Sequence, residues 1–113
     1  MSFGSRSLPK PTAAQERRFT EITHGNCVAC EQVGEFSYPE INHVVRANRR
    51  VGHDATYGLC SWHHRAVPSQ GLSPKQMRER YGVSLADSKP RFYAQFGTDI
   101  ELIEKQNQLM GVE

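Results

Sequence analysis

All three cysteines of this 113-residue chain lie in two short pairs of metal-ligand type. Cys27 and Cys30 form a CxxC pair, and Cys60 and His63 form a CxxH pair. Two intervening residues let both ligands of a pair face one ion, and zinc binds thiolate and imidazole ligands tetrahedrally. The spacing therefore predicts a structural zinc ion held by these four residues. With 37% hydrophobic residues the core is small, and a metal can supplement it.

Other interpretations of the two pairs are weaker. If the cysteines were only buried core residues beside an unrelated histidine, nothing would explain why every cysteine falls in a pair. The odd number of cysteines also argues against a disulfide framework. A redox CxxC is typical of a thioredoxin-like βαβ pattern, which this sequence lacks. A zinc site would suit a DNA-binding finger, an interaction module or an enzyme, so the segments between the pairs must decide.

Three further histidines lie between or directly beside the pairs. His43 ends a β-type run, His53 lies in the polar segment after it, and His64 follows the ligand His63. Hydrolysis of a phosphodiester needs a base that activates water and a cation that stabilises the charged phosphate. A strand histidine and a helix histidine tied together by zinc can supply the base and a metal ligand. Taken singly, each is more simply a structural or surface histidine; only the combination favours catalysis.

The order of these residues resembles the zinc-bearing HNH nucleases, which have the ββα-metal or His-Me finger architecture. The resemblance rests on the CxxC pair, on residues 41–44 (INHV) and on residues 59–64 (LCSWHH). The chain is also similar to the Ref family, phage-encoded recombination enhancement nucleases that act only with RecA filaments. That closer resemblance adds residues 52–53 (GH) and 96–103 (FGTDIELI), and it spans about residues 25–109.

The resemblance implies a role for each matching residue. His43 matches the general base that activates water, and His64 matches a ligand of a catalytic Mg²⁺ or Mn²⁺ ion. Asn42 stands where relatives usually have His or Asp as a second metal ligand, and a neutral amide is a weaker ligand for a hard cation. His53 is a further candidate for supporting this metal or contacting DNA. A ligand that many HNH enzymes carry four residues after the helix histidine would fall at Pro68, which cannot coordinate.

Positive charge is concentrated over residues 42–66, which hold four Arg against one Asp, although the net charge is only +2. A locally basic segment fits a polyanion site, and a solvated loop explains the charge equally well. If the chain is a nuclease, four arginine side chains of this segment are expected to contact DNA phosphates. Such contacts depend on salt and do not discriminate between base sequences. They are Arg46, Arg49, Arg50 and Arg65.

The elements that must position these residues begin with an N-terminal arm and a helix. Residues 1–12, rich in Ser, Pro and Gly, are expected to form a mobile arm, with residues 13–113 as a single domain. Thr12 is expected to cap a helix over residues 13–22. Some basic residues of this region are candidates for DNA or filament binding, with solvated charge as an equal alternative: Arg6, Lys10, Arg17 and Arg18.

The remaining elements follow from local signals. Residues 36–45 indicate a hairpin or two short strands, residues 46–54 a loop, and residues 55–59 an extended piece entering a helix near Ser61. Capping boxes begin helices after Ser73 and Thr98, and another helix is expected over residues 90–96. The last helix is expected to pack through its apolar residues: Ile100, Ile103, Leu109 and Met110.

Together these features predict a small α+β domain in which zinc staples a β-hairpin to a helix, with further helices on either side. The predicted function is metal-dependent cleavage of DNA held in a RecA filament, in the cytoplasm of a bacterial host. No apolar stretch is long enough to span a membrane, and the N-terminus lacks the apolar region of a signal peptide. Two alternatives stay open. One is a DNA- or RecA-binding accessory module with a decayed nuclease centre, which Asn42 and Pro68 favour, and the other is a protein-interaction zinc module.

Overall fold

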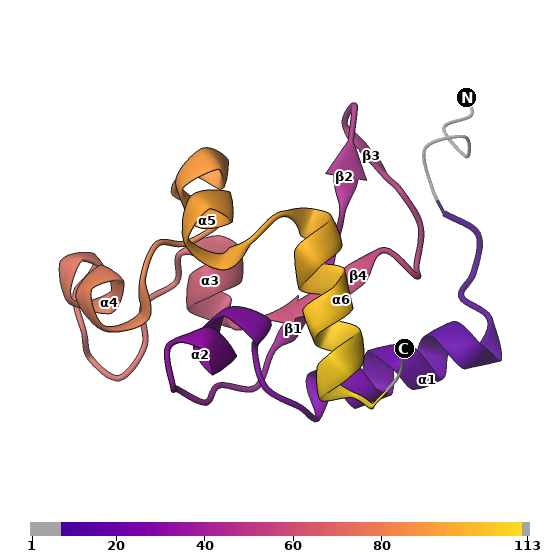
Figure 1. Ribbon diagram of the computed structural model, residues 1–113, viewed down its shortest axis with the longest axis horizontal. Coiled ribbons are helices and arrows are strands. Elements are labelled where there is room, and N and C mark those ends of the chain that lie inside the picture. Colours follow the sequence, from indigo (N-terminus) through magenta and orange to yellow (C-terminus); the bar gives the residue numbers. More distant parts are fainter. Residues whose placement is uncertain (1–7, 112–113) are drawn as a thin grey trace.

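Residues 8–111 are described by the computed structural model, and within them the chain forms six helices and four short strands (Figure 1). The architecture is a small α+β fold, as the sequence predicts. The helices are α1 (Ala13–Thr23), α2 (Val28–Gln32), α3 (Ser61–Arg65), α4 (Pro74–Tyr81), α5 (Lys89–Phe96) and α6 (Asp99–Leu109). The strands are β1 (Glu40–His43), β2 (Val45–Arg46), β3 (Arg49–Arg50) and β4 (Thr56–Leu59).

A two-stranded antiparallel sheet of β1 and β4 forms the centre of the molecule, and β4 leads directly into α3. In this register Glu40 lies opposite Leu59. Every residue of β4 is buried, and α1, α2 and α6 all contact the strand. The backbone N–H of Gly58 donates to the side-chain oxygen of Gln106 at 2.8 Å. Helix α6 therefore satisfies a polar group that an edge strand would otherwise leave unpaired.

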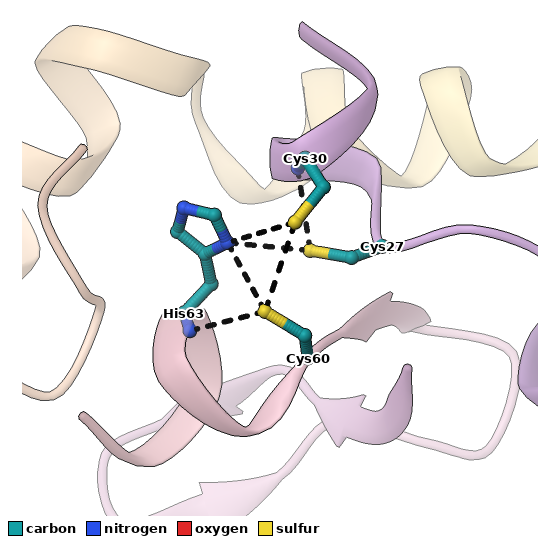
Figure 2. A group of neighbouring side chains, drawn as sticks. All are labelled: Cys27, Cys30, Cys60 and His63. Atoms are coloured by element: carbon teal, nitrogen blue, oxygen red, sulfur yellow. Dashed lines mark hydrogen bonds between the residues drawn. The ribbon is translucent and has the colours of Figure 1, made fainter. Parts of the chain in front are cut away.

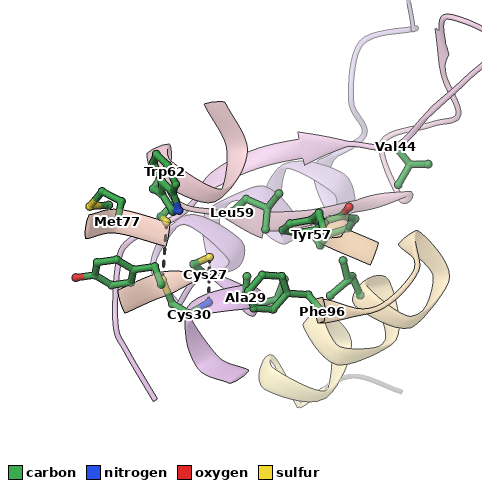
Figure 3. Close-up of a cluster of buried hydrophobic side chains, with 14 residues drawn as sticks. Cys27, Ala29, Cys30, Val44, Tyr57, Leu59, Trp62, Met77 and Phe96 are labelled. Carbon is green, nitrogen blue, oxygen red and sulfur yellow. Dashed lines mark hydrogen bonds between the residues drawn. The ribbon is translucent and has the colours of Figure 1, made fainter. Parts of the chain in front are cut away.

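The hydrophobic core lies between the sheet and the helices around it (Figure 3). Tyr57 and Leu59 of β4 are fully buried, as are Trp62 of α3 and Phe92 of α5. The Trp62 indole N–H donates to the Gly82 carbonyl at 2.9 Å, so the only tryptophan of the chain is both packed and hydrogen-bonded. The three cysteines belong to the same buried cluster. The core and the cysteine group are thus one continuous unit.

The helix boundaries follow the local signals in the sequence. Thr12, Ser73 and Thr98 cap α1, α4 and α6, each in a capping box with the residue three positions later. Gly82 and Gly97 end α4 and α5 with φ of 92° and 121°, a region that glycine adopts without steric cost. These predictions are confirmed.

Of the two possibilities for residues 36–45, two short strands are correct and a hairpin is wrong. Strand β1 and the first residue of β2 lie in this range, but β1 pairs with β4, and residues 36–39 form no strand. The expected loop over 46–54 instead contains most of a small hairpin of β2 and β3, in which only Val45 precedes the expected loop. Its turn residues Ala47 and Asn48 have φ of 52° and 63°, as in the mirror-image turns that favour hairpins. Alanine is a poor signal for such a turn because its Cβ disfavours positive φ.

The short helix α2 and the buried face of α6 were not anticipated either. Leu102 and Gln106 of α6 are buried, whereas Ile100 and Leu109 are 63% and 45% exposed. Ile103 is half-buried against the core, as expected. The expected residues therefore marked only part of the buried face of α6, which also contains Leu102 and the polar Gln106, whose partner is on β4.

Part of the expected N-terminal arm can be placed. Residues 1–7, with Arg6, lie outside the described residues. From Leu8 the chain leads into α1 and lies beside the β2–β3 hairpin and the segment after it (Figure 1).

Gly58 gives a test of the packing between α1 and the sheet. A Cβ at this position would lie 2.8 Å from Ile22 and from Pro39, so Gly58→Ala is expected to destabilise the protein by about 1–3 kcal/mol through overpacking. Gly52→Ala is the matched control, because a Cβ at that position would meet nothing within 4 Å. Urea unfolding measures both, and equal stabilities for the two variants would contradict this packing.

Candidate metal centre and catalytic cavity

The two ligand pairs have the same local structure. Cys27 is the N-cap of α2 and Cys60 is the N-cap of α3. Each thiol accepts a hydrogen bond from the backbone N–H three residues later, from Cys30 at 3.4 Å and from His63 at 3.5 Å. In each pair the first ligand therefore precedes a single helical turn, and the second ligand lies one turn further on. All four side chains point toward one another (Figure 2).

The distances between the four ligand atoms fit a tetrahedral metal site. Nδ1 of His63 lies 3.4 Å from Sγ of Cys27, 3.6 Å from Sγ of Cys30 and 3.3 Å from Sγ of Cys60. The Sγ atoms of Cys30 and Cys60 are 3.8 Å apart. Tetrahedral zinc with ordinary bond lengths would separate its ligands by about 3.8 Å for two sulfurs and about 3.5 Å for sulfur and nitrogen. This buried Cys3His group can hold a metal ion such as zinc.

The surroundings of His63 favour metal binding through Nδ1. Its Nε2–H donates to the Tyr81 carbonyl at the end of α4, at 2.8 Å. A carbonyl oxygen can only accept, so the lone pair of the neutral ring is on Nδ1, which faces the sulfurs. The ring also packs edge-on against Phe96 of α5 at 5.1 Å. Helices α4 and α5 thus orient this ligand.

The thiols themselves show why a cation suits this group. Burial, followed by hydrogen bonding to the neighbouring thiols, raises the pKa of Cys27 well above its usual value. Hydrogen bonds from Cys27 and Cys30 lower the pKa of Cys60. Three thiolates in one buried space repel one another, and a dication among them reverses this by stabilising every deprotonated ligand.

A second site lies on the sheet side of α3. Asn42, His43 and His64 line one cavity of about 270 Å³, so the structure brings together three of the predicted site residues. Helices α5 and α6 complete its wall, with Lys89, Tyr93 and Asp99 among the lining residues. A larger hollow of about 440 Å³ beside Tyr38 and Trp62 contains none of the five histidines.

His43 has the properties of a base that stays neutral. Its Nε2 lies 3.1 Å from Nδ1 of His53, and its ring meets Phe19 edge-on at 5.7 Å. Partial burial, and then the charges of Arg50 and His53, lower the pKa of His43 to about 4. At neutral pH the ring is therefore unprotonated and able to accept a proton.

His64 is held by a carboxylate that the sequence did not single out. Its Nδ1 lies 2.8 Å from Oε1 of Glu40 in β1, and a carboxylate can only accept, so in the neutral ring the lone pair is on Nε2. Glu40 also receives two hydrogen bonds from Arg65, which lower the pKa of its carboxyl group ahead of the contribution from His64. A histidine fixed by a carboxylate in this way is typical of metal ligands. Glu40 lies two residues before Asn42 on β1, which was the only hint in the sequence.

Asp99 is the second functional candidate that sequence reasoning missed. It is 8% exposed and accepts hydrogen bonds from Tyr57 at 2.7 Å, Tyr93 at 3.1 Å and Arg46 at 3.1 Å. Burial and the Asp99 carboxylate raise the pKa of Tyr57, so that hydroxyl remains a donor. The sequence showed Asp99 only as part of a helix start. In the fold it supplies a carboxylate to the cavity that contains Asn42.

The chain matches a protein-family model described as recombination enhancement, RecA-dependent nuclease, over residues 11–111. The chain belongs to this family. None of the curated proteins compared with it gives a match. Membership indicates a nuclease that works in recombination with DNA and RecA, and it confirms the family expected from residues 25–109. No helix among residues 8–111 is long and apolar enough to cross a membrane.

The arginines expected to bind DNA in this RecA-dependent nuclease occupy two places. Arg46, Arg49 and Arg50 lie on the exposed β2–β3 hairpin, which projects from the rest of the fold (Figure 1). Arg46 reaches back to Asp99, and Arg65 on α3 is paired with Glu40. Such partly exposed ion pairs are weak and can exchange for phosphate. Arg18, by contrast, is turned inward and donates to side chains of β4 and α6.

Two other expectations concern positions away from this cavity. His53 does not line it, and both of its ring nitrogens are hydrogen-bonded, so its expected role at a catalytic metal stays a prediction. Helix α3 ends at Arg65, and Ala66 follows with φ of 58°. Pro68 therefore lies beyond the helix, and its side chain has no atom that could bind a metal ion.

The neutral state of His43 can be measured directly. Near pH 5.5, about one unit below the usual histidine pKa, NMR of ¹⁵N-labelled protein should show the His43 ring still neutral. Arg50→Gln removes a positive charge that lowers this pKa, so the titration should move to higher pH. Arg49→Gln is the matched control on the same strand. A His43 ring already charged near pH 5.5, or equal shifts in both variants, would contradict this assignment.

Proposed function

We propose that the chain is a metal-dependent DNA endonuclease of the HNH type, acting on DNA bound by RecA filaments. The observation that supports this most is the shared cavity of His43 on β1 and His64 on α3, beside a buried Cys3His group. Strands β1 and β4 and helix α3 would then be the ββα-metal unit of such nucleases. A structural zinc ion at Cys27, Cys30, Cys60 and His63 would hold that unit together.

His43 is the proposed general base. Its unprotonated ring nitrogen takes a proton from the attacking water, as the bond from phosphorus to the leaving oxygen breaks. The low pKa of His43 keeps the ring ready for this step at neutral pH, at the cost of weaker basicity. Lys89 at the cavity wall adds a positive charge that attracts the phosphate.

His64 and Asn42 are the residues that would hold a catalytic Mg²⁺ or Mn²⁺ ion, with Asp99 as the carboxylate of the same cavity. The donor set fits such an ion only sparsely, because hard cations prefer several oxygen ligands. Water and the phosphate of the substrate would supply the remaining ligands, as is usual for Mg²⁺ in nucleotide chemistry. When bound, the ion stabilises charge on the phosphate and the leaving oxygen.

The exposed arginines are proposed to hold the DNA. Arg46, Arg49 and Arg50 on the β2–β3 hairpin and Arg65 on α3 flank the cavity residues in sequence, and all four are exposed. Contacts of this kind fix the duplex in place and weaken steeply with salt. The bacterial cytoplasm, where a RecA partner would be met, stays the predicted setting.

The second candidate function is a DNA- or RecA-binding accessory module without cleavage. It is favoured by the neutral amide of Asn42 at a position where a charged or imidazole ligand is expected. On this view DNA binding survives replacement of either His43 or His64, and no cation restores cleavage.

The deciding experiment measures nicking of DNA with Mg²⁺ or Mn²⁺, with and without RecA filaments. His43→Ala should lower the rate by about 10²–10⁴-fold, the usual range for a lost general base, and His64→Ala should also abolish cleavage. His24→Ala is the control, because His24 is an exposed histidine at the end of α1 whose ring is hydrogen-bonded to the Thr20 carbonyl, and it does not line the cavity. Equal cleavage by His43→Ala and the control would contradict the proposal, and binding without cleavage by the wild type would favour the accessory module.

A further inference from the structure

Three groups form an unbroken hydrogen-bonded chain that the cleavage mechanism above does not use. The Pro9 carbonyl lies 2.7 Å from Nε2 of His53. Nδ1 of the same ring lies 3.1 Å from Nε2 of His43. The N-terminal segment before α1 is thereby connected through His53 to the proposed base.

The chemistry of this chain determines where each proton lies. The Pro9 carbonyl can only accept, so Nε2 of His53 carries a hydrogen. In a neutral ring the other nitrogen, Nδ1, then has a lone pair and must accept. With both rings neutral, Nε2 of His43 is therefore the donor, and the lone pair of His43 lies on Nδ1. One backbone carbonyl in the N-terminal segment thus selects which nitrogen of His43 can take up a proton.

Helix α1 and β4 hold this arrangement in place. The Phe19 ring lies edge-on to both histidines, at 5.7 Å from His43 and 5.6 Å from His53. The buried Thr56 hydroxyl donates to the His53 carbonyl at 3.0 Å and accepts from Arg18 at 2.9 Å. The ring and the backbone of His53 are therefore both anchored, which is the requirement for positioning a neighbour.

A second contact ties α1 to the same loop. The Gln15 side-chain amide donates to Asp54 at 3.2 Å, one residue beyond His53. The segment from Leu8 to Pro11 also lines one hollow with His53 and Arg50. The N-terminal segment and the loop after β3 therefore contact each other at several points, and the Pro9 hydrogen bond is one of these contacts.

We infer that His53 is a positioning residue for His43, and that the Pro9 carbonyl fixes both rings in the tautomers that leave Nδ1 of His43 free to act as the base. This inference rests on the proposed nuclease function for its catalytic meaning. It gives His53 a role different from ligation of the catalytic metal. On this inference, residues 8–11 also contribute to the active site, through the backbone carbonyl of Pro9 and not through a side chain.

NMR of the full-length protein, with ¹⁵N-labelled histidine, tests the hydrogen-bonded chain independently of activity. The wild type should show His43 protonated on Nε2 alone, with a scalar coupling across the hydrogen bond to the unprotonated Nδ1 of His53. His53→Asn keeps an acceptor near the Nδ1 position and should retain the His43 tautomer. His53→Leu removes the acceptor and should give averaged tautomers. A proton on Nδ1 of His53, or averaged tautomers in the wild type, would overturn the inference.

Cleavage kinetics separate this inference from the proposed function. His53→Leu should lower kcat by about 10–100-fold with little change in KM, as for loss of an orienting partner, and His53→Asn should recover most of that loss. Wild-type rates in His53→Leu would overturn the positioning role alone, provided that His43→Ala is inactive. An inactive wild type would overturn the nuclease proposal and, with it, the catalytic meaning of the pair.

Discussion

The structure depends above all on the convergence of three thiols and one imidazole in the core. These four side chains come from the N-terminal ends of α2 and α3, and His63 is oriented by the end of α4 and by Phe96 of α5. Helices of five residues are not stable on their own, because too few hydrogen bonds offset the cost of nucleation. The orientation of α3 therefore depends on the tertiary contacts of its residues. A metal ion at the Cys3His group would fix that orientation from within the core.

The cavity inherits its geometry from this arrangement. Helix α3 presents His63 to the core and His64 to the sheet, where Glu40 of β1 receives it. Asn42 and His43 follow further along β1. Strand β1 and helix α3 therefore place their polar residues around one cavity. From the other side, α1 and the segment before it hold His53 against His43. The base and the proposed metal ligand are thus supported by separate parts of the chain.

The sequence was sufficient for features encoded locally, and insufficient for those made by distant contacts. The CxxC and CxxH pairs and the capping boxes at Thr12, Ser73 and Thr98 each depend on two residues three positions apart, so they could be predicted. The positions of Glu40 and Asp99 in the site could not, because each depends on a partner far away in the sequence, His64 for the first and Tyr57 for the second. The turn at Ala47 also gave no signal, since tertiary context overrides the preference of alanine.

A metal ion at Cys27, Cys30, Cys60 and His63 would join α2 to α3 in the core, and X-ray absorption at the zinc edge tests for that ion directly. The protein purified with zinc should show one zinc ion per chain, with three sulfurs at about 2.3 Å and one nitrogen at about 2.0–2.1 Å. A shell of nitrogen and oxygen alone, or zinc that is absent while the protein remains folded, would contradict the central claim.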